Sequence, residues 1–383
     1  MTISAVIVGL TLILLVLWEG FETMVLPRRV TRRFRLTRFF YRMTWRPWLW
    51  SVRRFIPARQ RENMLSYFGP LSLLLLLSVW AAGLITGFAL IYWATGSAVR
   101  GADGRSGIFT DIYLSGTTFF TLGLGDVVPQ TAIARTLTVL EAGMGFAFLA
   151  LVIGYLPALN QTFARREVTI SLLDARAGSP PTALEMLCRH DHEQGMEALR
   201  HLLYQWERWS AEFLEGHLSY PVLAYFRSQH DNQSWLAAMT AILDTCALVM
   251  TGLEGACERQ AELTFAMARH AVVDLSLVFL ARPHEPRHTR LSSETFSELC
   301  DLLRSKGLNL RNDAEAEERL AELRRMYEPY LHALSLHLNM PIPPWIPQAG
   351  QIDNWQASAW VERGPRKKRG DRSVVQSGGH FQR

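Results

Sequence analysis

The sequence predicts an all-α membrane protein with a helical cytoplasmic domain, and two observations support this fold class. The longest apolar runs fall within the first 165 of the 383 residues and approach or reach the length of a membrane helix. The later residues carry apolar side chains at helical spacing without the alternation typical of strands. We therefore divide the chain into an N-terminal transmembrane anchor (1–26), a basic cytoplasmic or interfacial linker (27–66), a membrane domain (67–165), a helical cytoplasmic domain (166–340) and a proline-rich, disordered tail (341–383).

Three apolar segments are candidates for helices that cross about 30 Å of hydrocarbon. The first, Ile3 to Trp18, is the shortest, and the core of a signal peptide is its alternative interpretation. Because it lacks a basic start and a small-residue cleavage site, we favour a retained anchor. The second span covers residues 70–95, which carry no charge, and the third covers residues 132–160.

The arginines predict the orientation of these spans. Residues 27–61 contain twelve arginines and no acid, and basic loops stay on the cytoplasmic side. We therefore expect a multi-pass protein of the cell membrane with its N-terminus outside and its C-terminal domain in the cytoplasm. The four cysteines all fall in that domain without a CxxC pair, as reduced structural thiols do.

Arg29, Arg32, Arg35 and Arg38 recur at every third residue, a spacing that allows two interpretations. A voltage-sensing helix shows this repeat, but it needs further helices with countercharges, and a single apolar segment precedes the stretch. We favour a surface helix whose arginines contact anionic lipid, followed by the interfacial aromatic run WRPWLW.

The connection between the second and third spans is unlike a simple turn. A short helix is predicted over residues 110–120, and the TLGLGD that follows at 121–126 cannot continue it because of Gly123, Gly125 and Pro129. A helix that enters the membrane and an extended segment that leaves it form a re-entrant loop. Membranes tolerate such a loop where its backbone lines water or is buried in protein, so the sequence predicts a pore or cavity.

The stretch TTFFTLGLGDVVP resembles the selectivity filter of potassium channels, and its GLGD is similar to the second pore loops of two-pore-domain potassium channels. The resemblance implies a filter made of Thr121, Leu122, Gly123, Leu124, Gly125 and Asp126. The permeant ion K+ would be bound by the backbone carbonyls of the first four, with Asp126 at the outer mouth. Leu124 replaces the usual aromatic residue and Phe120 a common threonine; because a carbonyl would bind the ion, a leucine is compatible with this role.

The third span, RTLTVLEAGMGFAFLALVIGYL, resembles the inner helix of bacterial one-pore-loop potassium channels. Residues 67–165 would then be a potassium-channel-like pore domain, to which the N-terminal helix is an addition. Gly143 and Gly145 are candidates for a hinge or for close helix packing, and the sequence leaves both open. An acid inside a span costs about 2.5 to 3.5 kcal/mol, so we expect Glu141 to face protein and to support the pore from behind the filter.

One pore loop per chain and no internal repeat imply that four chains form the filter, so we expect a homotetramer. The predicted function is a potassium-selective or cation channel whose helical cytoplasmic domain tunes assembly or gating. A nonconducting, membrane-anchored signalling or scaffold protein with a channel-like core is the alternative. We predict no enzyme activity, no cofactor and no nucleic-acid partner; membrane lipids are expected partners, and a ligand or protein that binds the cytoplasmic domain is left open.

The cytoplasmic part lacks the GxGxxG of nucleotide-binding gating domains, and we expect five to seven helices. Within it, residues 235–253 and 263–281 are apolar enough to raise the question of further spans. Charged residues such as Asp244 and Arg269 interrupt them, so we favour buried helices of a soluble domain. The run HDHE at 190–193 contains metal-ligand types, but consecutive residues do not share one helix face, which favours a solvated surface run.

Overall fold

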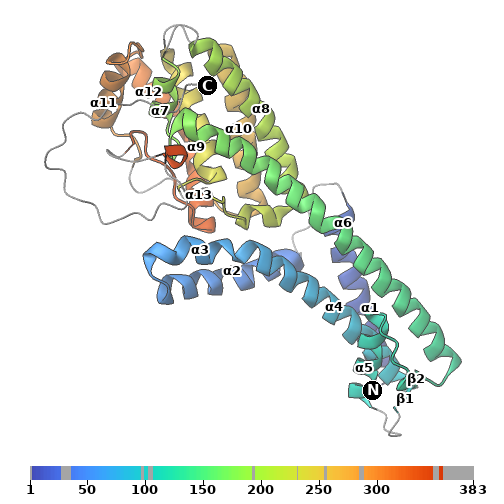
Figure 1. Ribbon diagram of the computed structural model, residues 1–383. Helices are drawn as coiled ribbons and strands as arrows, with labels where there is room; N and C mark the ends of the chain where they lie inside the picture. The colour runs from blue at the N-terminus through green and yellow to red at the C-terminus, as the bar shows by residue number, and fades with distance from the viewer. Residues whose placement is uncertain are drawn as a thin grey trace.

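The computed structural model describes residues 2–26, 36–95, 99–101, 107–191, 195–230, 232–253, 257–283, 289–347 and 353–356. Helices form nearly all of its regular structure, which confirms the all-α prediction. Figure 1 shows a slender group of helices at one end, a thick bundle at the other, and one long helix, α6, that runs through both.

The slender end contains the three predicted spans. Helix α1 (Thr2–Gly20) continues into a short π-helical turn, η1 (Phe21–Val25), and lies along α4 (Phe68–Ala94). The third span belongs to α6 (Ala132–Ala177). Helices containing Ile3–Val25, Ala58–Ala94 and Ala132–Ala177 are long and apolar enough to cross a membrane. The first is longer than the 3–18 predicted, because α1 continues to Gly20 and η1 extends the helix to Val25.

Helices α1 and α4 approach each other through small residues. A Cβ atom placed on Gly9 would lie 2.6 Å from the carbonyl oxygen of Gly87, and one placed on Gly87 would lie 2.6 Å from a side-chain carbon of Ile13. Close backbone approach of this kind is a common way to join helices in lipid, where apolar burial provides little drive. The N-terminal helix is thus packed as an integral part of the membrane domain.

The basic linker forms a helical hairpin beside the helical bundle (Figure 1). It consists of α2 (Leu36–Phe55), a 3-10 turn η2 (Ala58–Gln60) and α3 (Arg61–Ser66). The buried carboxylate of Glu19 at the end of α1 accepts hydrogen bonds from the backbone amides of Leu36 at 3.0 Å and Thr37 at 3.2 Å. An acid from one helix therefore satisfies free amides at the start of the next and fixes the position of α2.

The predicted lipid-facing arginines fall only partly within this hairpin. Arg29, Arg32 and Arg35 lie outside the described residues, whereas Arg38 lies in the first turn of α2. The WRPWLW run is also part of α2, whose buried face contains Tyr41, Trp45 and Val52.

The predicted boundary between residues 165 and 166 lies inside a continuous helix. The inner helix was expected to end at 160, but α6 continues to Ala177. The extension is explained by packing, because Arg166, Ile170 and Leu173 recur at helical spacing and are buried against the helical bundle. Pro157 lies within the helix and does not end it.

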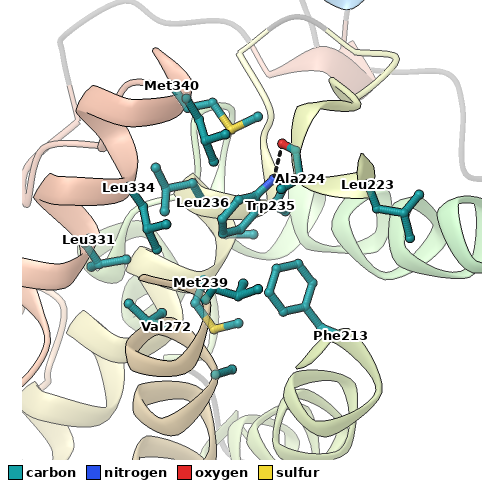
Figure 2. Packing of buried hydrophobic residues seen from close by; sticks show 14 of the residues in the cluster. Phe213, Leu223, Ala224, Trp235, Leu236, Met239, Val272, Leu331, Leu334 and Met340 are labelled. Atoms are coloured by element: carbon teal, nitrogen blue, oxygen red, sulfur yellow. Dashed lines mark hydrogen bonds between the residues drawn. The ribbon is translucent and has the colours of Figure 1, made fainter. Parts of the chain in front are cut away.

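The helical bundle is built around α9 (Trp235–Gly252). It is surrounded by α7 (Ala183–Arg189), α8 (Gly195–Ser219), η3 (Pro221–Tyr225), α10 (Glu258–Val278), α11 (Ser293–Arg304), α12 (Ala314–Arg325) and α13 (Glu328–Leu338), with a last turn, η4 (Asn354–Gln356). Figure 2 shows Trp235 and Met239 of α9 packed between Phe213 and the leucines of α13. Although α9 is long and apolar enough to cross a membrane, 89% of its apolar window is buried inside the protein.

The acid that interrupts α9 has buried partners. Arg290 contacts the carboxylate of Asp244 at 2.7 Å, and the hydroxyl of Tyr327 donates to it at 2.6 Å. Arg290 also pairs with Glu328 at 2.9 Å. Removing one partner of such a network would leave a buried charge unpaired, which typically costs about 3 to 5 kcal/mol.

The start of the predicted tail is ordered by contacts with the bundle. Trp345 is buried, with the guanidinium groups of Arg290 and Arg324 over its ring at 5.5 and 5.7 Å. Asp353 pairs with Arg189 at 2.9 Å. The proline-rich stretch, predicted to be extended, packs on protein at Trp345, and residues 348–352 and 357–383 of the predicted tail lie outside the described residues.

The HDHE run is only partly described. His190 follows α7, and its Nδ1 lies 2.7 Å from the carbonyl oxygen of Met186. The structure does not describe the third and fourth residues of the run. Within the described ranges, no group of three or more His, Cys, Asp and Glu side chains could hold a metal ion.

Candidate functional site

The pore loop begins with a short helix, α5 (Ile108–Phe119), close to the predicted 110–120. It packs against α4 and α6 through a buried face that includes Leu114, Ser115 and Phe119. Asp111 is buried in its first turn, where the partial positive charge of a helix N-terminus favours an acid. The loop is therefore anchored from its first turn to its last.

The backbone after α5 has an unusual alternation. Thr121, Gly123 and Gly125 have φ values of +57°, +55° and +80°, whereas the leucines between them do not adopt positive φ. When neighbouring residues alternate between right- and left-handed conformations, successive peptide units point the same way, so that their carbonyl oxygens gather on one side of the chain. The two glycines adopt this conformation without a steric penalty, but Thr121 does not.

The left-handed conformation of Thr121 is stabilised by hydrogen bonds to the end of α5. Its amide donates to the carbonyl of Thr118 at 2.9 Å, and the amide of Leu122 donates to the carbonyl of Thr117 at 2.7 Å. A left-handed residue other than glycine costs about 1 to 3 kcal/mol, and such strain is concentrated at functional sites.

The side chains of residues 120–126 are exposed in the single chain. Leu122 and Leu124 are 62% and 64% exposed, and Phe120 is 59% exposed. A Cβ atom on Gly123 or Gly125 would meet no atom within 4 Å. The loop is therefore anchored at its base by α5, while the side chains of residues 121–126 are exposed in the single chain.

The end of the segment is fixed by contacts that sequence reasoning missed. The hydroxyl of Tyr113 on α5 donates to the carboxylate of Asp126 at 2.8 Å. Strand β2 (Val127–Pro129) then pairs antiparallel with β1 (Val99–Gly101), with Val127 opposite Gly101. In the sequence, the only indication of the contact between Tyr113 and Asp126 is that a tyrosine on the predicted helix lies 13 residues before the aspartate.

Glu141 lies behind the pore helix and joins three helices. Its fully buried carboxylate accepts hydrogen bonds from the hydroxyl of Ser115 on α5 and, at 2.9 Å, from that of Tyr92 on α4. Ser115 also contacts the carbonyl of Ile85 at 2.8 Å, and Tyr92 contacts the hydroxyl of Thr138 at 3.1 Å. Sequence reasoning placed Glu141 against protein but did not identify these partners.

The two inner-helix glycines have different surroundings. A Cβ atom on Gly145 would lie 2.0 Å from the carbonyl oxygen of Phe119, so α6 touches the backbone at the end of α5 there. A Cβ atom on Gly143 would meet nothing within 4 Å. Because α6 is an uninterrupted helix at both positions, the geometry of Gly145 is that of close packing.

One side of α6 is apolar and uncovered along most of its length. Only 11% of its apolar window is buried, and Phe146 and Ile153 are 68% and 63% exposed. The uncovered apolar side of α6 continues past Arg165, where Val168 and Leu172 are 61% and 65% exposed.

Residues 76–161 match a protein-family model described as an ion channel. Over 203 residues the chain is 27% identical to YdjJ of Bacillus subtilis (strain 168), which is described as an uncharacterized membrane protein. This match covers 51% of the chain and 57% of the relative, so the chain spans little more than half of that protein. No solved structure matches the chain significantly.

The family match begins within α4 and includes α5, the loop and the membrane part of α6. The match thus covers all of α5 and the loop, together with parts of α4 and α6. An ion-channel family also indicates transport and not an enzymatic role. The comparisons and the fold together support an ion-channel domain within a multi-pass membrane protein.

Proposed function

We propose that the protein is a homotetrameric channel, selective for potassium, whose filter is Thr121 to Asp126. The observation that supports this most directly is the positive φ at Thr121, Gly123 and Gly125, at every second residue of the loop. This alternation aims successive carbonyls at one side, as a filter that replaces the hydration shell of a cation requires. The carbonyls of Thr121 through Leu124 bind K+, and Asp126 holds negative charge at the outer mouth.

The tetramer follows from what one chain leaves uncovered. A single loop with open space around it cannot surround an ion, and four copies around a cyclic axis can. The exposed pair Val168 and Leu172 supports assembly through α6, because these residues follow Arg165 and Arg166 at the proposed cytoplasmic exit, where lipid cannot cover them. Apolar side chains four residues apart on a helix suit contact with a second helix.

Glu141 and the cytoplasmic bundle have supporting roles in this proposal. Glu141 holds α4, α5 and α6 together outside the ion path, so that the loop keeps its shape when ions pass. The bundle is continuous with the pore-lining helix and is bonded to it by Arg166, whose guanidinium donates to the carbonyls of Leu223 at 2.8 Å and Phe226 at 2.9 Å. A shift of the bundle would therefore move α6, which is a route by which this domain tunes opening.

Potassium flux into liposomes that contain the purified full-length protein tests the proposal. Wild type should conduct, and Gly123→Ala should abolish flux without preventing assembly, because alanine strains a backbone with φ +55°. Gly116→Ala on α5 is the matched control, since a Cβ there meets nothing within 4 Å. Absence of flux from an assembled wild-type protein would instead support a nonconducting scaffold, and unchanged flux in Gly123→Ala would refute the filter.

A further inference from the structure

A cavity of about 500 Å³ lies where the membrane helices, the basic hairpin and the cytoplasmic bundle meet. Its walls include Leu76 of α4, Tyr155 of α6, Val222 of η3 and Leu336 of α13. Its volume is within the range of small-molecule sites, about 300 to 1,000 Å³. The cavity thus touches both halves of the protein and is large enough for a ligand.

One wall of the cavity carries a row of positive charge. Arg38, Arg42 and Arg46 all line it, and their spacing of four residues places them on one face of α2. Within the described part of the chain, neither Arg42 nor Arg46 is in an ion pair; Arg42 lies over the ring of Phe39 at 5.9 Å. Like charges at this spacing repel one another, so a bound anion would stabilise the helix.

Much of the remaining lining is apolar. Besides Leu76, Val222 and Leu336, it includes Leu26 and Leu280. Glu22 is the acid in the lining, and its carboxylate accepts a hydrogen bond from the indole of Trp18 at 2.8 Å. With three arginines against one glutamate, the cavity favours a ligand that has an anionic head and an apolar tail.

The position of the cavity identifies the class of ligand. In the proposed orientation, α2 lies at the cytoplasmic leaflet, where anionic phospholipids attract basic segments. Leu76 and Tyr155 belong to helices that cross the membrane, so an acyl chain could reach the cavity from the hydrocarbon. Guanidinium groups bind phosphate with two parallel hydrogen bonds, which makes an arginine row suited to a phosphodiester.

We propose that this cavity binds one anionic phospholipid of the cytoplasmic leaflet, with its phosphate on Arg42 and Arg46 and its acyl chains toward Leu76. The lipid would bridge α2 and the bundle near a junction that already contains direct contacts. There the indole of Trp45 donates to the carbonyl of His337 at 2.8 Å, and the rings of Tyr41 and Tyr225 stack at 5.4 Å. Occupancy would therefore strengthen the connection between the membrane domain and the cytoplasmic domain. The proposal depends on the proposed orientation but not on conduction.

Binding to the purified full-length protein in neutral detergent tests the site, with native mass spectrometry and the thermal unfolding midpoint as readouts. Phosphatidylglycerol should bind and raise the midpoint, whereas phosphatidylcholine, which has no net charge, should do neither. Glycerol 3-phosphate has the phosphate without acyl chains and should not compete. Equal binding of both lipids, or displacement of phosphatidylglycerol by glycerol 3-phosphate at equal concentration, would overturn the lipid assignment.

Two pairs of variants separate the cavity from general surface charge. Arg42→Gln with Arg46→Gln should weaken binding about 30-fold, since each arginine contributes about 1 kcal/mol and 1.4 kcal/mol is tenfold. Arg54→Gln with Arg59→Gln removes the same charge from exposed positions of the hairpin outside the cavity lining, and should change binding little. Equal loss in both pairs would show nonspecific attraction and overturn the site.

A third variant fills the cavity without changing its charge. Leu336 lines the cavity and is 56% exposed, so Leu336→Trp can be accommodated while it occupies the space for the lipid. Its unfolding midpoint without lipid should equal that of wild type, and its affinity for phosphatidylglycerol should fall. Undiminished affinity in a folded Leu336→Trp protein would show that the lipid is not bound in the cavity.

Discussion

The hydroxyl of Tyr92 donates a 2.9 Å hydrogen bond to the carboxylate of Glu141, and neither side chain is exposed. The bond joins the outer helix α4 to the inner helix α6, and Ser115 brings the pore helix into the same network. Helices α4, α5 and α6 therefore share one buried carboxylate, and the stability of the membrane domain should depend on it.

Removal of one hydrogen bond from this network should lower the free energy of unfolding less than removal of the Glu141 carboxylate that the bonds from Tyr92 and Ser115 share. Tyr92→Phe should lower the free energy of unfolding by about 1 kcal/mol, the value of a typical hydrogen bond. Glu141→Ala should lower it by about 2 to 3 kcal/mol, because two buried donors lose their acceptor. Denaturant unfolding in detergent measures both, with Tyr67→Phe, a tyrosine that is 55% exposed, as the control. Similar effects of all three substitutions would contradict a central role for Glu141.

The two glycines of α6 provide a second, internally matched test. Gly145→Ala should separate α6 from α5 and reduce both stability and flux, because its Cβ would collide with the carbonyl oxygen of Phe119 at 2.0 Å. Gly143→Ala should leave the packing within the chain intact and gain about 0.5 to 1 kcal/mol of helix propensity. If thermal unfolding and flux respond equally to both substitutions, the assignment of Gly145 to close packing is wrong.

Asp126 should raise the local concentration of cations at the mouth of the pore. Asp126→Asn should therefore lower single-channel conductance most strongly at low salt, and the deficit should shrink toward 1 M, where the screening length is about 3 Å. Tyr113→Phe removes the 2.8 Å hydrogen bond to Asp126 but keeps its charge, and should not produce this salt dependence. A deficit in Asp126→Asn that is independent of salt would exclude an electrostatic role at the mouth.

The helical bundle should lose stability in acid because of His217. Burial, together with the nearby Arg166, lowers the pKa of His217 to about 3, whereas an unfolded histidine has a pKa of about 6.5. Above the unfolded value the ring is neutral in both states. Below it the unfolded chain takes up a proton that the folded chain does not, so stability should fall by up to about 1.4 kcal/mol per pH unit.

Unfolding at pH 7.5 and pH 5 tests this expectation in wild type, His217→Gln and His201→Gln. The first substitution should flatten the pH dependence, while the second, at an exposed site on the same helix, should leave it in place. A pH dependence that persists unchanged in His217→Gln would assign the effect to other groups.

The spans and the pore loop could be predicted from the sequence because length, apolar composition and helix-breaking residues determine them locally. Residues 70–95 contain no charge, and an apolar run of that length is typical of a membrane helix. Gly123 and Gly125 likewise indicated a special backbone, which the structure shows as positive φ. The family match over residues 76–161 supports the ion-channel part of this interpretation.

Contacts between distant residues could not be predicted in the same way. Tyr92 and Glu141 are 49 residues apart, and only the packing of α4 on α6 brings them together. The continuation of α6 past residue 160 is decided by the burial of Ile170 and Leu173 against the bundle, where the sequence shows only a change of composition. The arginines at 29–38 recur at every third residue in the sequence. Those that line the cavity, Arg38, Arg42 and Arg46, recur at every fourth residue.

The reversal potential of purified protein in a bilayer, with potassium on one side and sodium on the other, tests the proposed filter most directly. A filter of backbone carbonyls from Thr121 to Leu124 predicts a reversal potential displaced far toward the potassium equilibrium potential. The displacement and the current should both be absent in Gly123→Ala. A wild-type current that reverses at zero would contradict potassium selectivity, and no current from an assembled tetramer would contradict the channel itself.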